Sequence, residues 1–248
     1  AVRALPLDQW VPVASITRRT ASMPGDYGAR ALQIVRDKVA PSLAAQVAEL
    51  KRQRATATMN AGVWKLPEGE AYYAWALKAG TTTTMSPEEV HQLGLEQLAA
   101  LQSDMDGLLK GLGMTQGTVG ERMTAMGKDP RYLFPNDDTG RAQILAYIDG
   151  RLTDIRTRLP RAFATLVPAK LVVKRVPVEI EAGAPGAYAG AGSIDGTTPG
   201  NYYINLRDTS IWPRYGLPTL TYHEGIPGHI WQGEYTYKLP LIRSLLAF

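Results

Sequence analysis

Three residues with the chemistry of a metal-dependent hydrolase lie close together in the sequence: His223, Glu224 and His229. Neutral imidazole rings are good ligands for zinc, and a neighbouring carboxylate can act as a general base toward a water molecule that the metal polarises. The chain has no cysteine, which excludes disulfides, thiolate metal sites and cysteine nucleophiles. The third histidine, His91, has no carboxylate cluster of metal-ligand spacing around it, and we expect it to be structural.

The spacing of the two histidines differs from the familiar His-Glu-x-x-His motif, because His229 follows His223 by six residues instead of four. On a regular helix, six residues leave two side chains roughly 120° apart, so both could not face one metal. Pro227 and Gly228 lie between them, and both residues favour a break in a helix. Such a break could bring the histidines together, but the spacing alone leaves open whether they meet.

The elements that must position these residues are helical over residues 1–170. The clearest helix start is Ser86, because it can cap a helix that has Pro87 at its first position and Glu89 three residues after the cap. We expect Pro160 to break or kink a later helix. The other helices predicted from apolar spacing cover residues 29–39, 41–50, 70–78, 119–126 and 139–166.

The pattern changes after Pro168, where β-branched residues indicate short strands over residues 171–180 and 201–206. Pro177 should limit the first of these strands to an edge or an irregular position. Residues 182–200 are rich in Gly, Ala and Pro, with Tyr188 in their middle, and no strand is predicted there. We therefore expect a mainly α fold with a small antiparallel β-sheet (α+β). Residues 171–248 should hold the sheet and the His-Glu helix beside it, in one continuous domain with residues 1–170.

Composition excludes several classes of function. The chain has 248 residues, of which 45% are hydrophobic and 20% charged, and these values are typical of a globular protein. No apolar run approaches the length of a membrane span, so we expect none. The net charge of +4 is spread along the chain, and we expect no nucleic-acid partner. No Gly-x-Ser-x-Gly elbow is present, so a serine nucleophile is poorly supported.

The motif His-Glu-Gly-Ile-Pro-Gly-His-Ile-Trp-Gln, residues 223–232, resembles the signature of the bacterial domain-of-unknown-function family 885. Further segments resemble that family in the same order along the chain, and together the similarities run from about residue 60 to residue 232. These segments are residues 62–73, 81–94, 186–190 and 199–205.

The family is grouped with zincin-like helical metallopeptidases, and the resemblance implies that fold in incomplete form. It implies that His223 and His229 bind zinc and that Glu224 is the general base. Family members are much longer, and they carry a Glu-Gly-Trp-Ala type helix after the histidines. The third zinc ligand is therefore expected from sequence beyond Phe248, since Glu234 does not match the pattern. We expect the chain to be a fragment, with the remainder of its parent chain as a partner and a periplasmic or exported location.

The sequence favours a metal-dependent hydrolase, a zinc peptidase acting on peptide or peptide-like substrates. The strand at residues 201–206 could be an edge to which an extended peptide adds. The residues expected to contact the substrate are Tyr188, Tyr202, Tyr203 and Asn205. Two alternatives remain open: a catalytically inactive zincin-like binding protein, and a structural interaction module with Trp212 and Trp231 as interface anchors.

Overall fold

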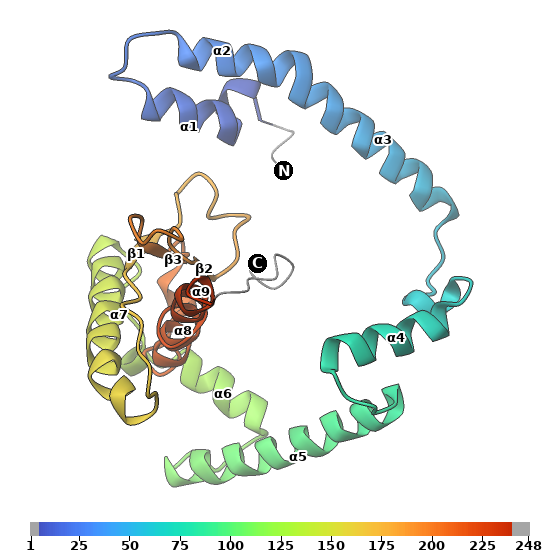
Figure 1. Cartoon of the computed structure of the whole chain (residues 1–248), viewed down its shortest axis with the longest axis vertical. Helices are drawn as coiled ribbons and strands as arrows, with labels where there is room; N and C mark the ends of the chain where they lie inside the picture. Colours follow the sequence, from blue (N-terminus) through green and yellow to red (C-terminus); the bar gives the residue numbers. More distant parts are fainter. Residues whose placement is uncertain (1–4, 240–248) are drawn as a thin grey trace. The chain divides into compact units, whose positions relative to one another are not determined.

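The computed structural model describes residues 5–239, in which helices precede a small sheet and two further helices (Figure 1). The chain divides into two compact units, Ala1–Val119 and Gly120–Phe248. The first strand begins at Leu171, where the sequence predicts the change from helix to strand. The mainly α fold with a small sheet is confirmed.

The first unit contains helices separated by short breaks. They are α1 (Val11–Arg19), α2 (Tyr27–Ile34), α3 (Ala40–Thr56), α4 (Gly69–Thr81) and α5 (Pro87–Gly111). A π-helical turn, Val35–Val39, joins α2 to α3. Trp10, Val13 and Val35 form the buried cluster of this unit.

The predicted start of α5 is confirmed by a complete capping box. The Ser86 hydroxyl accepts a hydrogen bond from the Glu89 backbone N–H at 3.2 Å, and the Glu89 carboxylate accepts one from the Ser86 N–H at 2.7 Å. This exchange satisfies two backbone donors that the first turn of a helix leaves free. The local sequence therefore fixes where α5 begins.

The second unit is built around the sheet. Its elements are α6 (Val119–Gly127), which starts at the boundary, α7 (Asp138–Arg158), β1 (Leu171–Arg175), β2 (Ala187–Gly190), β3 (Gly200–Ile204), α8 (Leu217–Glu224) and α9 (His229–Tyr237). Asp137 caps α7 by accepting a hydrogen bond from the Gly140 N–H at 2.8 Å. As predicted, the helix ends before Pro160, in a 3-10 turn over Leu159–Arg161.

The sheet has the order β1-β3-β2 and is mixed, not purely antiparallel as expected. β2 pairs antiparallel with β3, with Ala187 opposite Ile204, whereas β1 pairs parallel with β3, with Leu171 opposite Gly200. The parallel pairing is possible because 24 residues, 176–199, connect β1 to β3 and return the chain to the same end of the sheet. β2 lies inside the Gly-, Ala- and Pro-rich segment 182–200, in which we predicted no strand.

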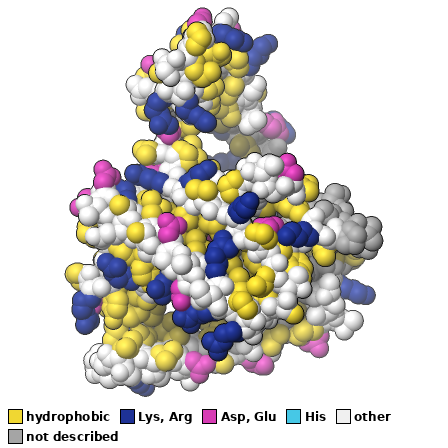
Figure 2. All heavy atoms as spheres, turned by 60° about the vertical axis from the view of Figure 1, so that its left-hand side comes forward, with side chains coloured by type: hydrophobic (Ala, Val, Ile, Leu, Met, Phe, Trp, Pro, Cys, Tyr) yellow, Lys and Arg dark blue, Asp and Glu magenta, His cyan; other side chains and the backbone are white. Residues whose placement is uncertain are grey.

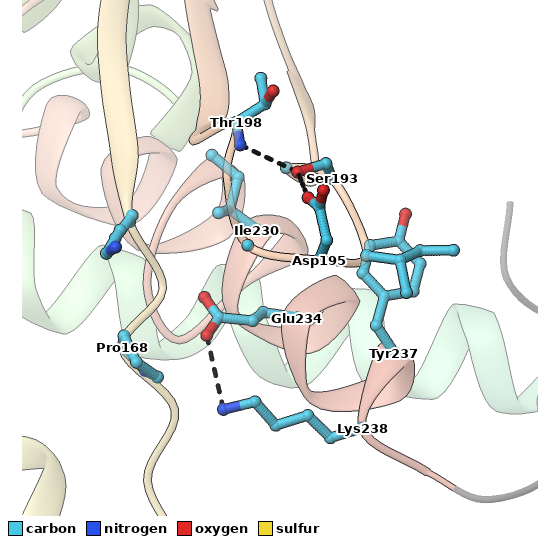
Figure 3. Close-up of a pocket in the computed structure, with 12 residues that line it drawn as sticks. Pro168, Ser193, Asp195, Thr198, Ile230, Glu234, Tyr237 and Lys238 are labelled. Atoms are coloured by element: carbon cyan, nitrogen blue, oxygen red, sulfur yellow. Dashed lines mark hydrogen bonds and ion pairs between the residues drawn. The ribbon is translucent and has the colours of Figure 1, made fainter.

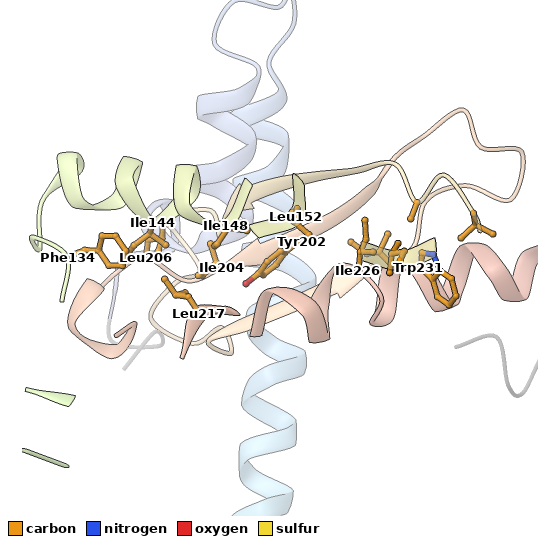
Figure 4. Close-up of a cluster of buried hydrophobic side chains, with 14 residues drawn as sticks. Phe134, Ile144, Ile148, Leu152, Tyr202, Ile204, Leu206, Leu217, Ile226 and Trp231 are labelled. Carbon is orange, nitrogen blue, oxygen red and sulfur yellow. The ribbon is translucent and has the colours of Figure 1, made fainter. Parts of the chain in front are cut away.

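One hydrophobic cluster fills the second unit and connects the sheet to its helices (Figure 4). Tyr202 and Ile204 project from β3 into this cluster, where they meet Ile144 and Ile148 of α7. Leu217, Ile226 and Trp231 close it from the α8–α9 side. The side chains near the two histidines are therefore held by the core of this unit.

No helix within residues 5–239 combines the length and apolar character that a membrane span requires. In the face shown in Figure 2, Lys and Arg side chains are scattered among acidic and hydrophobic ones. That face therefore carries no continuous basic area.

Candidate metal centre and adjoining groove

The histidine motif forms a break between two helices. α8 ends at Glu224, and α9 begins at His229, so residues 225–228 are not helical. The helices remain connected across the break, because the Trp231 N–H donates to the Gly225 carbonyl at 3.3 Å. The break resolves the problem of the six-residue spacing, since the two histidines need not lie on one regular helix.

Gly228 is required for this path of the chain. A Cβ atom at Gly228 would overlap the carbonyl oxygen of His223, so the backbone passes closer to α8 than any other residue allows. Gly225 is also tightly enclosed, because a Cβ there would lie 2.8 Å from the Thr221 carbonyl oxygen and 2.9 Å from Leu152. The two glycines let α9 start directly beside the end of α8.

The break brings the two imidazole rings together. The ring centroids of His223 and His229 are 4.7 Å apart, and the ring planes are nearly perpendicular, at 83°. Both side chains are exposed. The sequence left open whether the histidines meet, and in the structure they are neighbours.

Glu224 lies beside the pair but is buried, with 7% of its surface exposed. Its position follows from the helix period, because Leu217, Thr221 and Glu224 form the inward stripe of α8. Glu224 and His229 line an open groove of about 780 Å³ between β2 and α9. The carboxylate therefore faces the same space as one of the two imidazoles.

The donor set fits part of a zinc site. Two adjacent imidazoles match the nitrogen ligands that zinc prefers, and catalytic zinc sites have three protein ligands. Within residues 5–239, no group of three or more His, Asp or Glu side chains could together hold a metal ion. Glu234 is turned to another pocket, where it pairs with Lys238 at 3.7 Å.

β2 is one of the two edge strands of the sheet, whereas the strand that we predicted as an edge, β3, is not. β3 lies between β1 and β2, so both of its sides are paired. The Asn205 N–H donates to the Gly186 carbonyl at 2.7 Å, and ladder bonds alternate along an antiparallel strand. The N–H and C=O groups of Ala187 and Ala189 therefore point away from β3, toward the groove that these residues line.

The tyrosines expected to contact substrate have different positions. Tyr188 lines the groove, and its ring stacks on that of Tyr203 with the centroids 5.0 Å apart. Tyr202 is instead fully buried, because alternate residues of β3 face the core. Burial raises the pKa of the Tyr202 phenol. Its hydroxyl lies near that of Thr221, but neither makes a well-formed hydrogen bond within the described residues.

Asn205 holds a loop instead of facing the groove. Its buried amide donates to the Glu181 carbonyl at 2.7 Å and accepts from the Arg207 N–H at 3.1 Å. The Glu181 side chain is paired with Arg175 through two contacts of 2.7 and 3.0 Å. These bonds order the connection that leads into β2. Asn205 therefore acts on the groove only through the strand that forms its wall.

A second pocket, of about 310 Å³, lies on the other side of α9 (Figure 3). Ile230, Glu234 and Tyr237 line it from the helix, and Tyr237 also lines the groove. Asp195 accepts hydrogen bonds from the hydroxyl of Ser193 and from the N–H and hydroxyl of Thr197. These hydrogen bonds lower the pKa of Asp195 to about 2, and the bond from Ser193 makes the largest contribution.

Sequence reasoning missed most of the residues that line the groove, among them Gln232 and Gly233 of α9. Gly233 lets α9 approach the end of β2, because a Cβ there would lie 2.5 Å from the Cβ of Ala191. Both follow His229 by one helical turn, at three and four residues, and this spacing places them on its side of α9. That signal was available once α9 was known to start at His229.

The sequence profile of the family described as "Bacterial protein of unknown function (DUF885)" matches residues 5–248. Among solved structures, the chain is similar to one described as "The crystal structure of the putative lipoprotein from Colwellia psychrerythraea", with a TM-score of 0.90 and 32% sequence identity. The similarity covers 100% of this chain and 44% of that chain, so this chain spans less than half of that relative. A comparison with curated proteins returns no match.

Proposed function

The chain belongs to the bacterial family DUF885, and from this premise we propose that it carries part of the active site of a zinc-dependent peptidase. The observation that carries the proposal is the contact between the rings of His223 and His229, whose centroids are 4.7 Å apart, next to the buried Glu224. Two adjacent imidazoles, one of which faces the same groove as a carboxylate, supply the kinds of side chain that hydrolysis by polarised water requires.

In this proposal His223 and His229 hold zinc through their imidazole nitrogens, and the third ligand comes from sequence beyond Phe248. When bound, zinc polarises a water molecule and lowers its pKa. Glu224 accepts a proton from that water and later donates it to the leaving amine. The groove position of Glu224 supports this role, because the base must reach the atoms that react.

The proposed substrate is an extended peptide that adds to the free edge of β2. The backbone groups of Ala187 and Ala189 are available for such pairing, and the small side chains there let another chain approach closely. Tyr188 lines the same groove and is proposed to contact the bound peptide. Tyr202 and Asn205 have no direct contact with substrate in this proposal, because both are buried.

The test uses the full-length protein that contains this chain, with metal content measured by plasma mass spectrometry. We expect about one zinc per chain in the wild type and in Glu224→Gln, and its loss in His223→Ala. His91→Ala is the matched control, since His91 is exposed on α5 and lies outside the His223–His229 motif in the sequence.

Hydrolysis of a synthetic peptide pool, followed by mass spectrometry, tests the reaction. Glu224→Gln should lower the rate by roughly 10²–10⁴-fold, as expected when a general base is lost. Bound zinc without hydrolysis would instead favour an inactive zincin-like binding protein. Metal content that is low and equal in wild type and His223→Ala would favour a structural interaction module.

The description of the solved relative as a lipoprotein supports an exported location for the longer protein. We therefore expect the protein, expressed from its complete coding sequence, to appear in the periplasmic or membrane fraction of the cell. Recovery only with the cytoplasmic marker would contradict this location.

A further inference from the structure

α5 and its C-cap residue Leu112 carry an apolar stripe in which the leucines are exposed and Met105 is partly buried. Its members follow one another at alternating steps of three and four residues: Leu98, Leu101, Met105, Leu108 and Leu112. The four leucines are between 52% and 72% exposed. The stripe spans the fifteen residues 98–112, a rise of about 21 Å along a helix. We call this set the α5 stripe.

The opposite face of α5 is polar, so the helix is amphipathic. Gln92, Glu96, Ser103 and Lys110 lie roughly half a turn away from the stripe at 100° per residue. Spacing of three and four residues is the pattern by which one helix packs along another. The α5 stripe therefore has the form of a helix-packing seam, not of scattered surface leucines.

α5 gains little stability from its own unit. Of its 25 residues, only Leu109 is buried. Helices in proteins are stabilised mainly by packing of their apolar face. An exposed apolar stripe of this size is unusual on the surface of a folded soluble protein. Some other segment must cover these leucines if α5 is to be stable.

We propose that the α5 stripe packs against an amphipathic helix from another part of the same polypeptide in the full-length protein. A solved relative contains the whole of this fold, with a TM-score of 0.90, in only 44% of its chain. More than half of that relative lies outside the matched part, and an exposed helical seam is a surface suited to packing against the rest of such a protein. The inference is independent of zinc binding and of hydrolysis.

Cysteine accessibility tests whether the stripe is covered. The 248 residues contain no cysteine, so single cysteines can be placed at will once any elsewhere in the full-length protein are replaced. Leu101→Cys and Leu108→Cys report on the stripe, and Ser103→Cys on the polar face of the same helix. We expect maleimide labelling of the two stripe variants to be roughly tenfold or more slower than that of Ser103→Cys in the native protein, with equal rates in urea.

Photo-crosslinking identifies what covers the stripe. The full-length protein carries p-benzoylphenylalanine in place of Leu101, and an equal mixture of isotopically light and heavy protein is irradiated. We expect crosslinked peptides of uniform isotope composition that join α5 to a segment outside residues 1–248. The same substitution at Ser103 should give few crosslinks.

Three outcomes would overturn the proposal. Crosslinks of mixed isotope composition would show that a second copy covers the stripe. Crosslinks to residues 120–239 would show that the second unit of this chain covers it. Labelling of Leu101→Cys and Leu108→Cys as fast as that of Ser103→Cys would show that nothing does. Circular dichroism of each variant excludes misfolding as the cause, and agreement between the two stripe positions guards against a local effect.

Discussion

The Tyr202 hydroxyl is buried without a well-formed hydrogen bond within the described residues. A buried polar group in this condition lowers stability by roughly 1–3 kcal/mol. We therefore expect Tyr202→Phe to raise the free energy of unfolding by about 1 kcal/mol, since it removes the hydroxyl and keeps the ring. Urea unfolding followed by circular dichroism measures the change.

Tyr203→Phe is the control for this prediction, because Tyr203 is the next residue of β3 but only partly buried. Its effect should stay within about 0.5 kcal/mol. Destabilisation of Tyr202→Phe would contradict the prediction and would indicate that an ordered water satisfies the hydroxyl.

The Arg175–Glu181 pair predicts a dependence of stability on pH. Glu181 is 4% exposed, and the hydrogen bond from Arg175 holds its pKa below the usual range. A carboxyl with a lowered folded-state pKa adds stability above its unfolded pKa, about 4.3, and loses it as the pH falls through the folded value. The urea midpoint of the wild type should therefore fall as the pH drops below about 4.3 and on through the lower folded-state pKa of Glu181.

Glu181→Gln removes this titration and isolates its contribution. At pH 7 we expect the variant to be less stable by roughly 1–3 kcal/mol, a value reduced because Arg175 keeps contact with solvent. Its midpoint should change less than that of the wild type as the pH falls. Parallel curves for the two proteins would show that the pair does not contribute to folding.

At the scale of elements, the structure depends on a helix break that only glycine permits. Gly228→Ala would place a methyl group against the His223 carbonyl. We expect it to cost about 1–3 kcal/mol of stability, as overpacking does, and to separate the two imidazoles. Gly107→Ala is the matched control, because nothing lies within 4 Å of a Cβ at that site in α5. It should stabilise the helix by roughly 0.5–1 kcal/mol. Equal effects of the two changes would contradict the role of Gly228.

Elements defined by local signals were predictable from the sequence. Ser86 and Glu89 fixed the start of α5, and Pro160 marked the end of α7, because caps and prolines act on their own turn. β2 was missed because Ala-Tyr-Ala-Gly has little preference for a strand and forms one only by pairing with β3. The direction of β1 depended on the same distant pairing.

In the candidate site, too, residue types were predictable from the sequence, whereas their arrangement in space was not. His223, Glu224 and His229 were identifiable from residue type, but their meeting depends on the backbone at Gly228 and could not be read from spacing. Tyr202 was placed wrongly in the cleft because a strand pattern gives two faces without saying which one is buried. That choice is made by α7 and α8, which cover the inner face of β3.

At the scale of the whole molecule, the two units have unequal cores. Trp10, Val13 and Val35 form the buried cluster of the first unit, whereas the cluster of the second contains 14 buried side chains. Differential scanning calorimetry of residues 1–248 should therefore give two transitions, of which that of the first unit comes at lower temperature. Removal of residues 1–119 should abolish only this lower transition. A single transition for the 248-residue chain would contradict the division.

The edge strand β2 has a consequence for selectivity under the proposed function. Its four residues, Ala187–Gly190, give a ladder of about 13 Å, and apart from Tyr188 they carry almost no side chain. Such an edge recognises the extended form of a chain through its amides and has little means of telling one side chain from another. It is therefore suited to many short peptides of unrelated sequence, as in a scavenging or recycling role, more than to one defined protein target.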